Sequence, residues 1–165
     1  MSHQVWLLRH GEAEPHDARP DAERRLTARG EEQAAAAGRA LVALETPFQF
    51  VFTSPKVRAA ETARLACESL GLVPEVHTPL AEGFGLDDLR ELLHIVGHDR
   101  RLLLVGHNPD FAQLVGDLTG ANARVKKGGI VGMRVHGGRG ELLCLLQPRE
   151  LARIIARAVE TSSPS

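Results

Sequence analysis

The sequence contains little cysteine, no long apolar run and almost no net charge, and each shortage excludes a class of protein. Its two cysteines, Cys67 and Cys144, are far apart and lack Cys-x-x-Cys spacing. We therefore expect both to be small core residues of a protein in a reducing compartment. The longest apolar runs, such as 142–146, are far shorter than the ~20 residues that span a bilayer. Twenty basic and 21 acidic side chains leave a formal net charge of −1, which predicts neither nucleic acid nor membrane as a partner.

The length of 165 residues is typical of one domain, and a chain of this size buries roughly 70% of the surface that its unfolded form exposes. Because there is no internal repeat and no low-complexity linker, we predict a single domain over residues 1–160 and a flexible tail at 161–165. The first apolar run meets Arg9 and His10 before a signal segment could develop, so we expect a cytoplasmic protein. We also expect a monomer.

Short apolar runs alternate with amphipathic stretches along the chain, as in proteins where strands alternate with helices. The segments predicted as strands are 5–8, 48–52, 75–77, 102–105, 130–136 and 141–146, the last two forming a hairpin around Gly137-Gly138. The segments predicted as helices are 27–44, 54–70, 87–96, 108–118 and 150–159. This order predicts a three-layer α/β/α fold with a mostly parallel central sheet and an antiparallel edge.

Three of the predicted strand-to-helix turns carry residues suited to chemistry. The first strand ends at Arg9 and His10, the helix after the second strand contains Arg58 in its first turn, and the buried strand 102–105 is followed by His107. Ligands of such sheets bind beyond the carboxyl ends of the strands, which share one edge. We therefore predict that these four side chains face one crevice.

Two arginines, two histidines and two helix N-termini around one small volume suit a tetrahedral oxyanion, and phosphate is the obvious candidate. Cationic neighbours disfavour imidazolium, so Arg9 and Arg58 should keep His10 neutral and able to attack phosphorus through a ring nitrogen. Arg9, Arg58 and His107 would then stabilise negative charge on the equatorial oxygens of the phosphoryl group. This chemistry needs no metal and no other cofactor.

Three motifs in this sequence resemble those of the histidine phosphatase superfamily, which includes the cofactor-dependent phosphoglycerate mutases. They are Leu8-Arg9-His10-Gly11-Glu12, Ser54-Pro55 with Arg58-Ala59 and Glu61-Thr62-Ala63, and Val105-Gly106-His107-Asn108. The resemblance covers about residues 5–146 and implies a single histidine phosphatase domain with a phosphoglycerate mutase-like fold. It implies that His10 is the phospho-accepting nucleophile, that Arg9, Arg58 and His107 complete the phosphate pocket, and that water hydrolyses a phosphohistidine enzyme intermediate.

Within the superfamily, the chain is most similar to the SixA-type phosphohistidine phosphatases of bacteria. Only a short strand and one helix fit between residues 70 and 102, whereas mutases and broad phosphatases carry longer insertions that help to roof the pocket. The resemblance therefore implies a signal-transduction phosphatase that acts on a phosphorylated histidine-containing protein domain. The alternatives are a phosphatase for small phosphate esters and a non-catalytic module that binds phosphate or phosphoprotein, although retention of His10 favours an enzyme.

The resemblance also implies a proton donor, because the superfamily commonly places a carboxylic acid after the third strand. Glu82 is the nearest match, with Asp87 or Asp88 behind it. A phosphohistidine substrate depends less on such an acid, because its phosphorus–nitrogen bond is labile and imidazole leaves readily once it is protonated.

Other polar residues have simpler interpretations. His94 and His98 lie four apart on a predicted helix without a third ligand, so we predict no metal site. Lys126-Lys127 is interpreted as a turn, with a docking patch for an acidic partner as the alternative. Ser54 and Asn108 are interpreted as helix caps.

Overall fold

The computed structural model describes residues 1–162 and contains one six-stranded sheet in the order β3-β2-β4-β1-β5-β6. The strands are β1 (Ser2–Arg9), β2 (Phe50–Thr53), β3 (Glu75–Val76), β4 (Arg101–Gly106), β5 (Ile130–His136) and β6 (Arg139–Leu146). The first four strands of that order are mutually parallel, whereas β5 is antiparallel to β1 and β6 is antiparallel to β5. The predicted mostly parallel sheet with an antiparallel edge is therefore confirmed.

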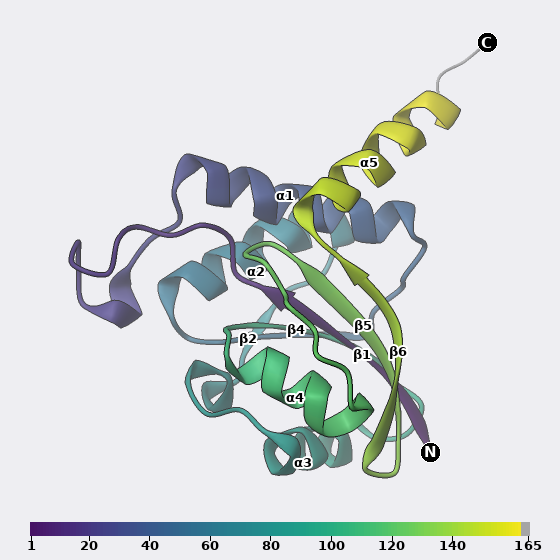
Figure 1. Ribbon diagram of the computed structural model, residues 1–165. Helices are drawn as coiled ribbons and strands as arrows, with labels where there is room; N and C mark the ends of the chain where they lie inside the picture. Colours follow the sequence, from purple (N-terminus) through teal and green to yellow (C-terminus); the bar gives the residue numbers. More distant parts are fainter. Residues whose placement is uncertain (163–165) are drawn as a thin grey trace.

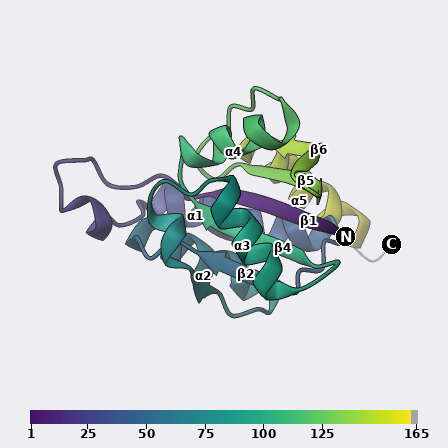
Figure 2. The same cartoon turned by 90° about the horizontal axis from the view of Figure 1, so that it is seen from below.

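Within residues 1–162, five α-helices and two short 3₁₀ helices accompany the sheet. They are η1 (Asp21–Glu23), α1 (Ala28–Ala43), α2 (Val57–Leu70), η2 (Thr78–Ala81), α3 (Leu86–Val96), α4 (Asp110–Thr119) and α5 (Pro148–Ser162). Helices α1, α2 and α5 lie on one side of the sheet and α3 and α4 on the other (Figure 1), and Figure 2 shows α3 and α4 nearest to the viewer. The predicted three-layer arrangement is confirmed.

The period-two pattern of the strands builds two cores, one on each face of the sheet. In β1, Val5 and Leu7 pack into the core under α3 and α4, whereas Trp6 and Leu8 pack into the core under α1, α2 and α5. The aliphatic run of β4, residues 102–105, is fully buried because both faces of this central strand are covered. The sheet edge that carries the predicted site is therefore fixed by packing from both sides.

Several element boundaries differ from the expected ones. Thr27 caps α1 as predicted, since its Oγ1 accepts from the Gly30 N–H at 3.1 Å. Helix α2, however, begins at Val57 rather than at Ser54-Pro55, because the Ser54 N–H still donates to the Val105 carbonyl and so belongs to the sheet. Helix α5 continues to Ser162, and the rest of the tail expected from residue 161 lies outside the described residues.

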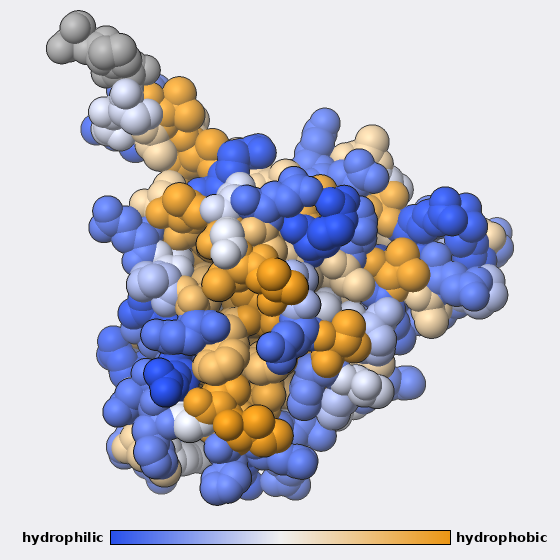
Figure 3. Space-filling view, turned by 180° about the vertical axis from the view of Figure 1, so that it is seen from behind, coloured by the Kyte–Doolittle hydropathy of each residue, from blue (hydrophilic) through white to orange (hydrophobic). Residues whose placement is uncertain are grey.

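Parts of the surface are apolar. Figure 3 shows apolar residues gathered down the middle of the face opposite to the view of Figure 1, with hydrophilic residues around them. Exposed apolar side chains are ordinary on protein surfaces, so this face by itself identifies no partner. None of the helices within residues 1–162 combines the length and the apolar character needed to cross a bilayer.

The contact between α1 and α2 gives a prediction about stability. A Cβ atom added at Gly38 of α1 would lie 2.3 Å from the carbonyl oxygen of Ala66 in α2. Gly38→Ala should therefore lower the free energy of unfolding by about 1–3 kcal/mol, as overpacking does, although alanine is the better helix former. Urea denaturation measures this change.

Gly116→Ala in α4 is the matched control, because the added Cβ would meet nothing closer than 3.6 Å. It should raise the free energy of unfolding by up to about 1 kcal/mol. If Gly38→Ala proved as stable as Gly116→Ala, the close approach of α1 to α2 would be wrong.

Candidate active site

Two histidines meet at the carboxyl edge of the sheet, because β1 and β4 are parallel neighbours with Arg9 opposite Gly106. The His10 N–H donates to the Gly106 carbonyl at 3.0 Å and so extends the pairing by one residue. As a result the rings of His10 and His107 lie with their centroids 5.2 Å apart. Both side chains are buried, with 6% of each residue exposed.

The hydrogen bonds of His10 fix which ring nitrogen carries the proton. Its Nδ1 lies 2.7 Å from the Gly11 carbonyl oxygen, which can only accept, so Nδ1 carries the hydrogen. Nε2 then holds the lone pair, and the Nε–H of Arg58 points at it from 3.4 Å. His10 is thus a neutral imidazole whose unprotonated nitrogen faces a guanidinium.

Arg58 reaches this position from the first turn of α2, because helical side chains lean toward the helix N-terminus. Its terminal nitrogens donate to the backbone carbonyl of Asp21 at 2.7 Å and to the Asp21 carboxylate at 3.3 Å. Arg58 forms no ion pair with Glu61, which pairs with Arg64 instead. Arg58 is 5% exposed, so its guanidinium belongs to the site.

His107 and Arg9 each bring an unused polar atom to this edge of the sheet. His107 Nε2 lies 2.7 Å from Ser54 Oγ, which also accepts from the Lys56 N–H. Among residues 1–162, three buried side-chain nitrogens lack a hydrogen-bond partner, and His107 Nδ1 and Arg9 Nε are two of them. Buried polar atoms are normally paired, so two orphans here indicate a site for a polar ligand.

Burial is the main reason why both histidines stay neutral. It lowers the pKa of His10 to about 3, and the charges of His107, Arg58 and Arg9 act in the same direction, against the Gly11 hydrogen bond. The pKa of His107 is also lowered to about 3, first by burial and then by Arg58 and Lys56. The predicted direction for His10 is confirmed, but the cations contribute less than desolvation does.

Asp21 is a residue of this site that the sequence did not indicate. Its carboxylate lies 3.0 Å from Lys56 Nζ, 3.3 Å from Arg58 and 3.0 Å from Arg24. The hydrogen bond from Lys56 first, then the hydrogen bond from Arg24 and the positive charge of Arg58, hold the pKa of Asp21 well below its usual range. No motif or periodicity marks Asp21, because it begins the three-residue helix η1 between β1 and α1.

Thr62 and Ser54 were also missed as site residues, although both lie in the second motif. Thr62 Oγ1 accepts from the Gly11 N–H at 3.1 Å and donates to the Arg58 carbonyl at 2.7 Å, so it ties the turn after β1 to α2. Ser54 was interpreted as the cap of α2, and that interpretation is wrong, since Lys56 occupies the N-cap position. Asn108 does accept from the first turn of α4, through the Ala112 N–H at 3.3 Å.

Glu82 forms no hydrogen bond with His10 or His107. Glu82 is exposed, and it forms no hydrogen bond or ion pair with any described residue. The alternatives have other partners, since Asp87 pairs with Arg90 and Asp88 accepts from the Gly85 N–H at the start of α3. The assignment of Glu82 as proton donor therefore stays a prediction.

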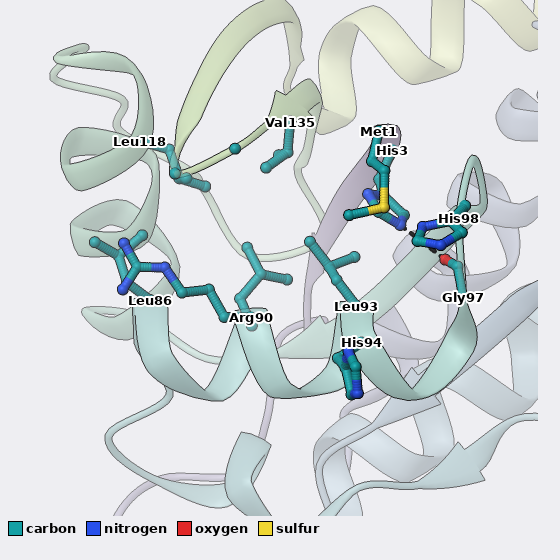
Figure 4. Close-up of a pocket in the computed structure, with 13 residues that line it drawn as sticks. Met1, His3, Leu86, Arg90, Leu93, His94, Gly97, His98, Leu118 and Val135 are labelled. Atoms are coloured by element: carbon teal, nitrogen blue, oxygen red, sulfur yellow. Dashed lines mark hydrogen bonds between the residues drawn. The ribbon is translucent and has the colours of Figure 1, made fainter.

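A separate cavity of about 320 Å³ lies at the opposite edge of the sheet, where β1 begins. Figure 4 shows Leu93, Leu118 and Val135 around it, with His94 and His98 on the side of α3 and the loop that follows. Its lining is mainly apolar and includes none of the predicted site residues. Within residues 1–162 no group of three or more His, Cys, Asp or Glu could hold a metal ion.

The sequence matches a known family over the segment that builds this site. Residues 5–108 match the model of the histidine phosphatase superfamily, branch 1. The chain belongs to the histidine phosphatase superfamily. The matched segment contains Arg9, His10, Arg58 and His107.

Individual proteins and solved structures are also similar to this chain. An uncharacterized protein of Picosynechococcus sp. is 33% identical over 162 residues, which cover 90% of this chain and 98% of that protein. The structure of the protein histidine phosphatase SixA complexed with tungstate has a TM-score of 0.81 at 24% identity, covering 90% of this chain and 99% of that one. A putative alpha-ribazole-5'-P phosphatase from Escherichia coli K-12 has a TM-score of 0.75 at 22% identity, covering 88% and 97%. The phosphoglycerate mutase-like fold is thereby confirmed.

The position of Arg58 predicts a loss of anion binding in Arg58→Lys. Lysine keeps the positive charge, but it lacks the Nε–H that faces His10 and the planar guanidinium that can donate two hydrogen bonds to one oxyanion. The affinity for orthophosphate, measured by calorimetry, should fall about tenfold or more, with little change in unfolding. Arg64→Lys on the exposed side of the same helix is the control, and equal affinities in the two variants would place Arg58 outside the anion site.

The lowered pKa values of His10 and His107 predict that acid weakens folding. Below about pH 6.5 the unfolded chain binds a proton at each histidine, whereas the folded protein does so only near pH 3. This contribution to stability is complete above pH 6.5 and is lost as the pH falls below it, by about 2 kcal/mol per histidine at pH 4.5.

Urea unfolding at pH 7 and pH 4.5 in phosphate-free buffer measures this loss. His107→Gln should lose about 2 kcal/mol less than the wild type over that interval. The same loss in both proteins would show that His107 is not held neutral by the fold.

Proposed function

We propose that this protein is a metal-independent phosphatase that hydrolyses phosphohistidine on a protein substrate through a phosphohistidine intermediate at His10. The observation that carries the proposal is the neutral ring of His10, whose Nδ1 proton faces the Gly11 carbonyl and whose unprotonated Nε2 accepts from the Arg58 Nε–H at 3.4 Å. A nucleophile and an oxyanion site therefore share one buried edge of the sheet.

In the proposed reaction, the Nε2 lone pair of His10 forms a bond to phosphorus while the phosphorus–nitrogen bond of the substrate breaks. The bonding electrons stay on the substrate imidazole, which takes a proton. Arg9, Arg58 and His107 stabilise the negative charge on the three equatorial oxygens during this transfer. A water molecule then attacks phosphorus, releases orthophosphate and returns the electron pair to Nε2.

Two features support a protein-borne phosphohistidine. Between α2 and β4 the chain has only a two-residue strand, one 3₁₀ turn and α3, so no long insertion is present there to roof the site. A labile phosphorus–nitrogen bond also needs no strong general acid, which fits the exposed position of Glu82. Action in cytoplasmic phosphohistidine signalling belongs to the same proposal.

A small phosphate ester is the second candidate substrate. The likeness to the putative alpha-ribazole-5'-P phosphatase favours it, since that structure shares the fold at a TM-score of 0.75. A non-catalytic phosphate-binding module is less well supported, because binding alone would not require the unprotonated Nε2 of His10.

Trapping the intermediate tests the proposal. The protein is mixed with a ³²P-phosphorylated histidine-containing phosphotransfer domain and, separately, with labelled small phosphomonoesters, and is then quenched in alkali. We expect an acid-labile label on the protein and orthophosphate release, fastest with the phosphorylated domain. Both should be lost in His10→Ala.

His94→Ala, in the separate apolar cavity, is the matched histidine control and should be labelled like the wild type. Label and turnover with phosphomonoesters alone would favour the second candidate. Orthophosphate binding without turnover of any substrate would favour the binding module.

A further inference from the structure

A wide cleft adjoins the candidate active site and shares Arg9 with it. The cleft has a volume of about 820 Å³ and is lined by five segments: the end of β1 with the turn that follows it, the start of α1, Asn108 after β4, residues 124–127 before β5, and residues 147–150 at the start of α5. Its lining includes Arg9 but not His10, which directly follows Arg9 in the chain.

The lining of this cleft is strongly basic, although the whole chain has a net charge of −1. Its six basic residues are Arg9, Arg29, Arg124, Lys126, Lys127 and Arg149, and its acidic residues are Glu12 and Glu150. Arg29 lies 3.7 Å from Glu12. Among the residues that the structure describes, the other five cations form no ion pair.

Hydrogen bonds hold the cationic segment 124–127 in place against the end of β1. The Gly128 N–H donates to the carbonyls of Arg9 and His10, both at 3.0 Å. The side chains of Arg9 and Asn108 both donate to the Val125 carbonyl, at 2.9 and 3.1 Å. Lys126 and Lys127, interpreted from the sequence as a turn, do form one, since the Gly129 N–H donates to the Lys126 carbonyl.

The start of α5 is tied to the same segment through one side chain. Gln147 accepts from the Lys126 N–H through Oε1 at 3.0 Å and donates to the Arg124 carbonyl through Nε2. The basic side chains of the turn and of α5 are therefore presented together, at a fixed place next to His10. Unpaired like charges at a fixed place repel one another, and a negatively charged surface relieves that repulsion.

We propose that this basic cleft binds carboxylates on the protein surface that surrounds the substrate phosphohistidine, so that the protein selects phosphohistidines in acidic surroundings. The inference rests on the proposed function and adds the charge of the substrate's surface to it. The cations come from four segments around a cleft much larger than one phosphate, which fits an extended acidic surface better than a single small anion. Complementary charge of this kind accelerates encounter and selects partners.

Three phosphohistidine peptides of equal length test the proposal, with four glutamates, four glutamines or four lysines around the phosphohistidine. Phosphoimidazole serves as a substrate that has no peptide around the phosphorylated ring. For the wild type we expect kcat/KM to decrease from the Glu peptide through the Gln peptide to the Lys peptide, with about a tenfold difference between the Glu and Lys peptides. This difference in kcat/KM should become smaller in 0.5 M NaCl, because salt screens exposed charges.

The variant Lys126→Glu with Lys127→Glu should reverse the preference between the Glu and Lys peptides. Arg39→Glu with Arg139→Glu is the matched control, since both arginines are exposed, lie outside the cleft and give the same change in net charge. This control should keep the wild-type order.

Each result decides between the two proposals. If the wild type hydrolyses the Glu and Lys peptides equally well, the docking proposal is wrong and the phosphohistidine phosphatase remains. If the lysine variant slows all four substrates by the same factor, the lysines act on the reaction itself and docking is again wrong. If folded wild-type protein hydrolyses neither the peptides nor phosphoimidazole, the proposed function fails and the docking proposal fails with it.

Discussion

The parallel pairing of β1 with β4 places the two histidines, and the other features of the site depend on it. Because Arg9 lies opposite Gly106, the next residue of each strand, His10 and His107, emerges at the same level of the sheet edge. A shift of one residue in this register would send the side chains of both strands to the wrong faces and open both cores. The packing that stabilises the fold is therefore also what aligns the two rings.

Burial has two consequences at this edge of the sheet. It removes water from His10 and His107 and so keeps both rings neutral, at a cost to stability in acid. It also leaves His107 Nδ1 and Arg9 Nε without partners inside the protein. Both atoms can still form hydrogen bonds, in surroundings where such bonds are stronger than in water.

Patterns in the sequence predicted the three layers, the mostly parallel sheet with an antiparallel edge, and four residues at the strand-to-helix turns. Arg9, His10, Arg58 and His107 could be found because strand ends and helix starts can be located from apolar periodicity. Asp21 could not, because it lies in a three-residue 3₁₀ helix without apolar periodicity and meets Arg58 across 37 positions of sequence. The role of Ser54 was misjudged for a related reason, since a serine followed by proline looks the same whether its N–H is free or bonded to a neighbouring strand.

The carboxylate of Asp21 also changes what an arriving phosphate meets. Arg58 and Lys56 are already partly neutralised by a resident negative group, so a dianion has to share them rather than occupy bare cations. Such sharing weakens the hold on every phosphorylated species by a similar factor, and liberated orthophosphate is among them. In the proposed reaction, the carboxylate of Asp21 would therefore also lower the affinity of the site for the orthophosphate product.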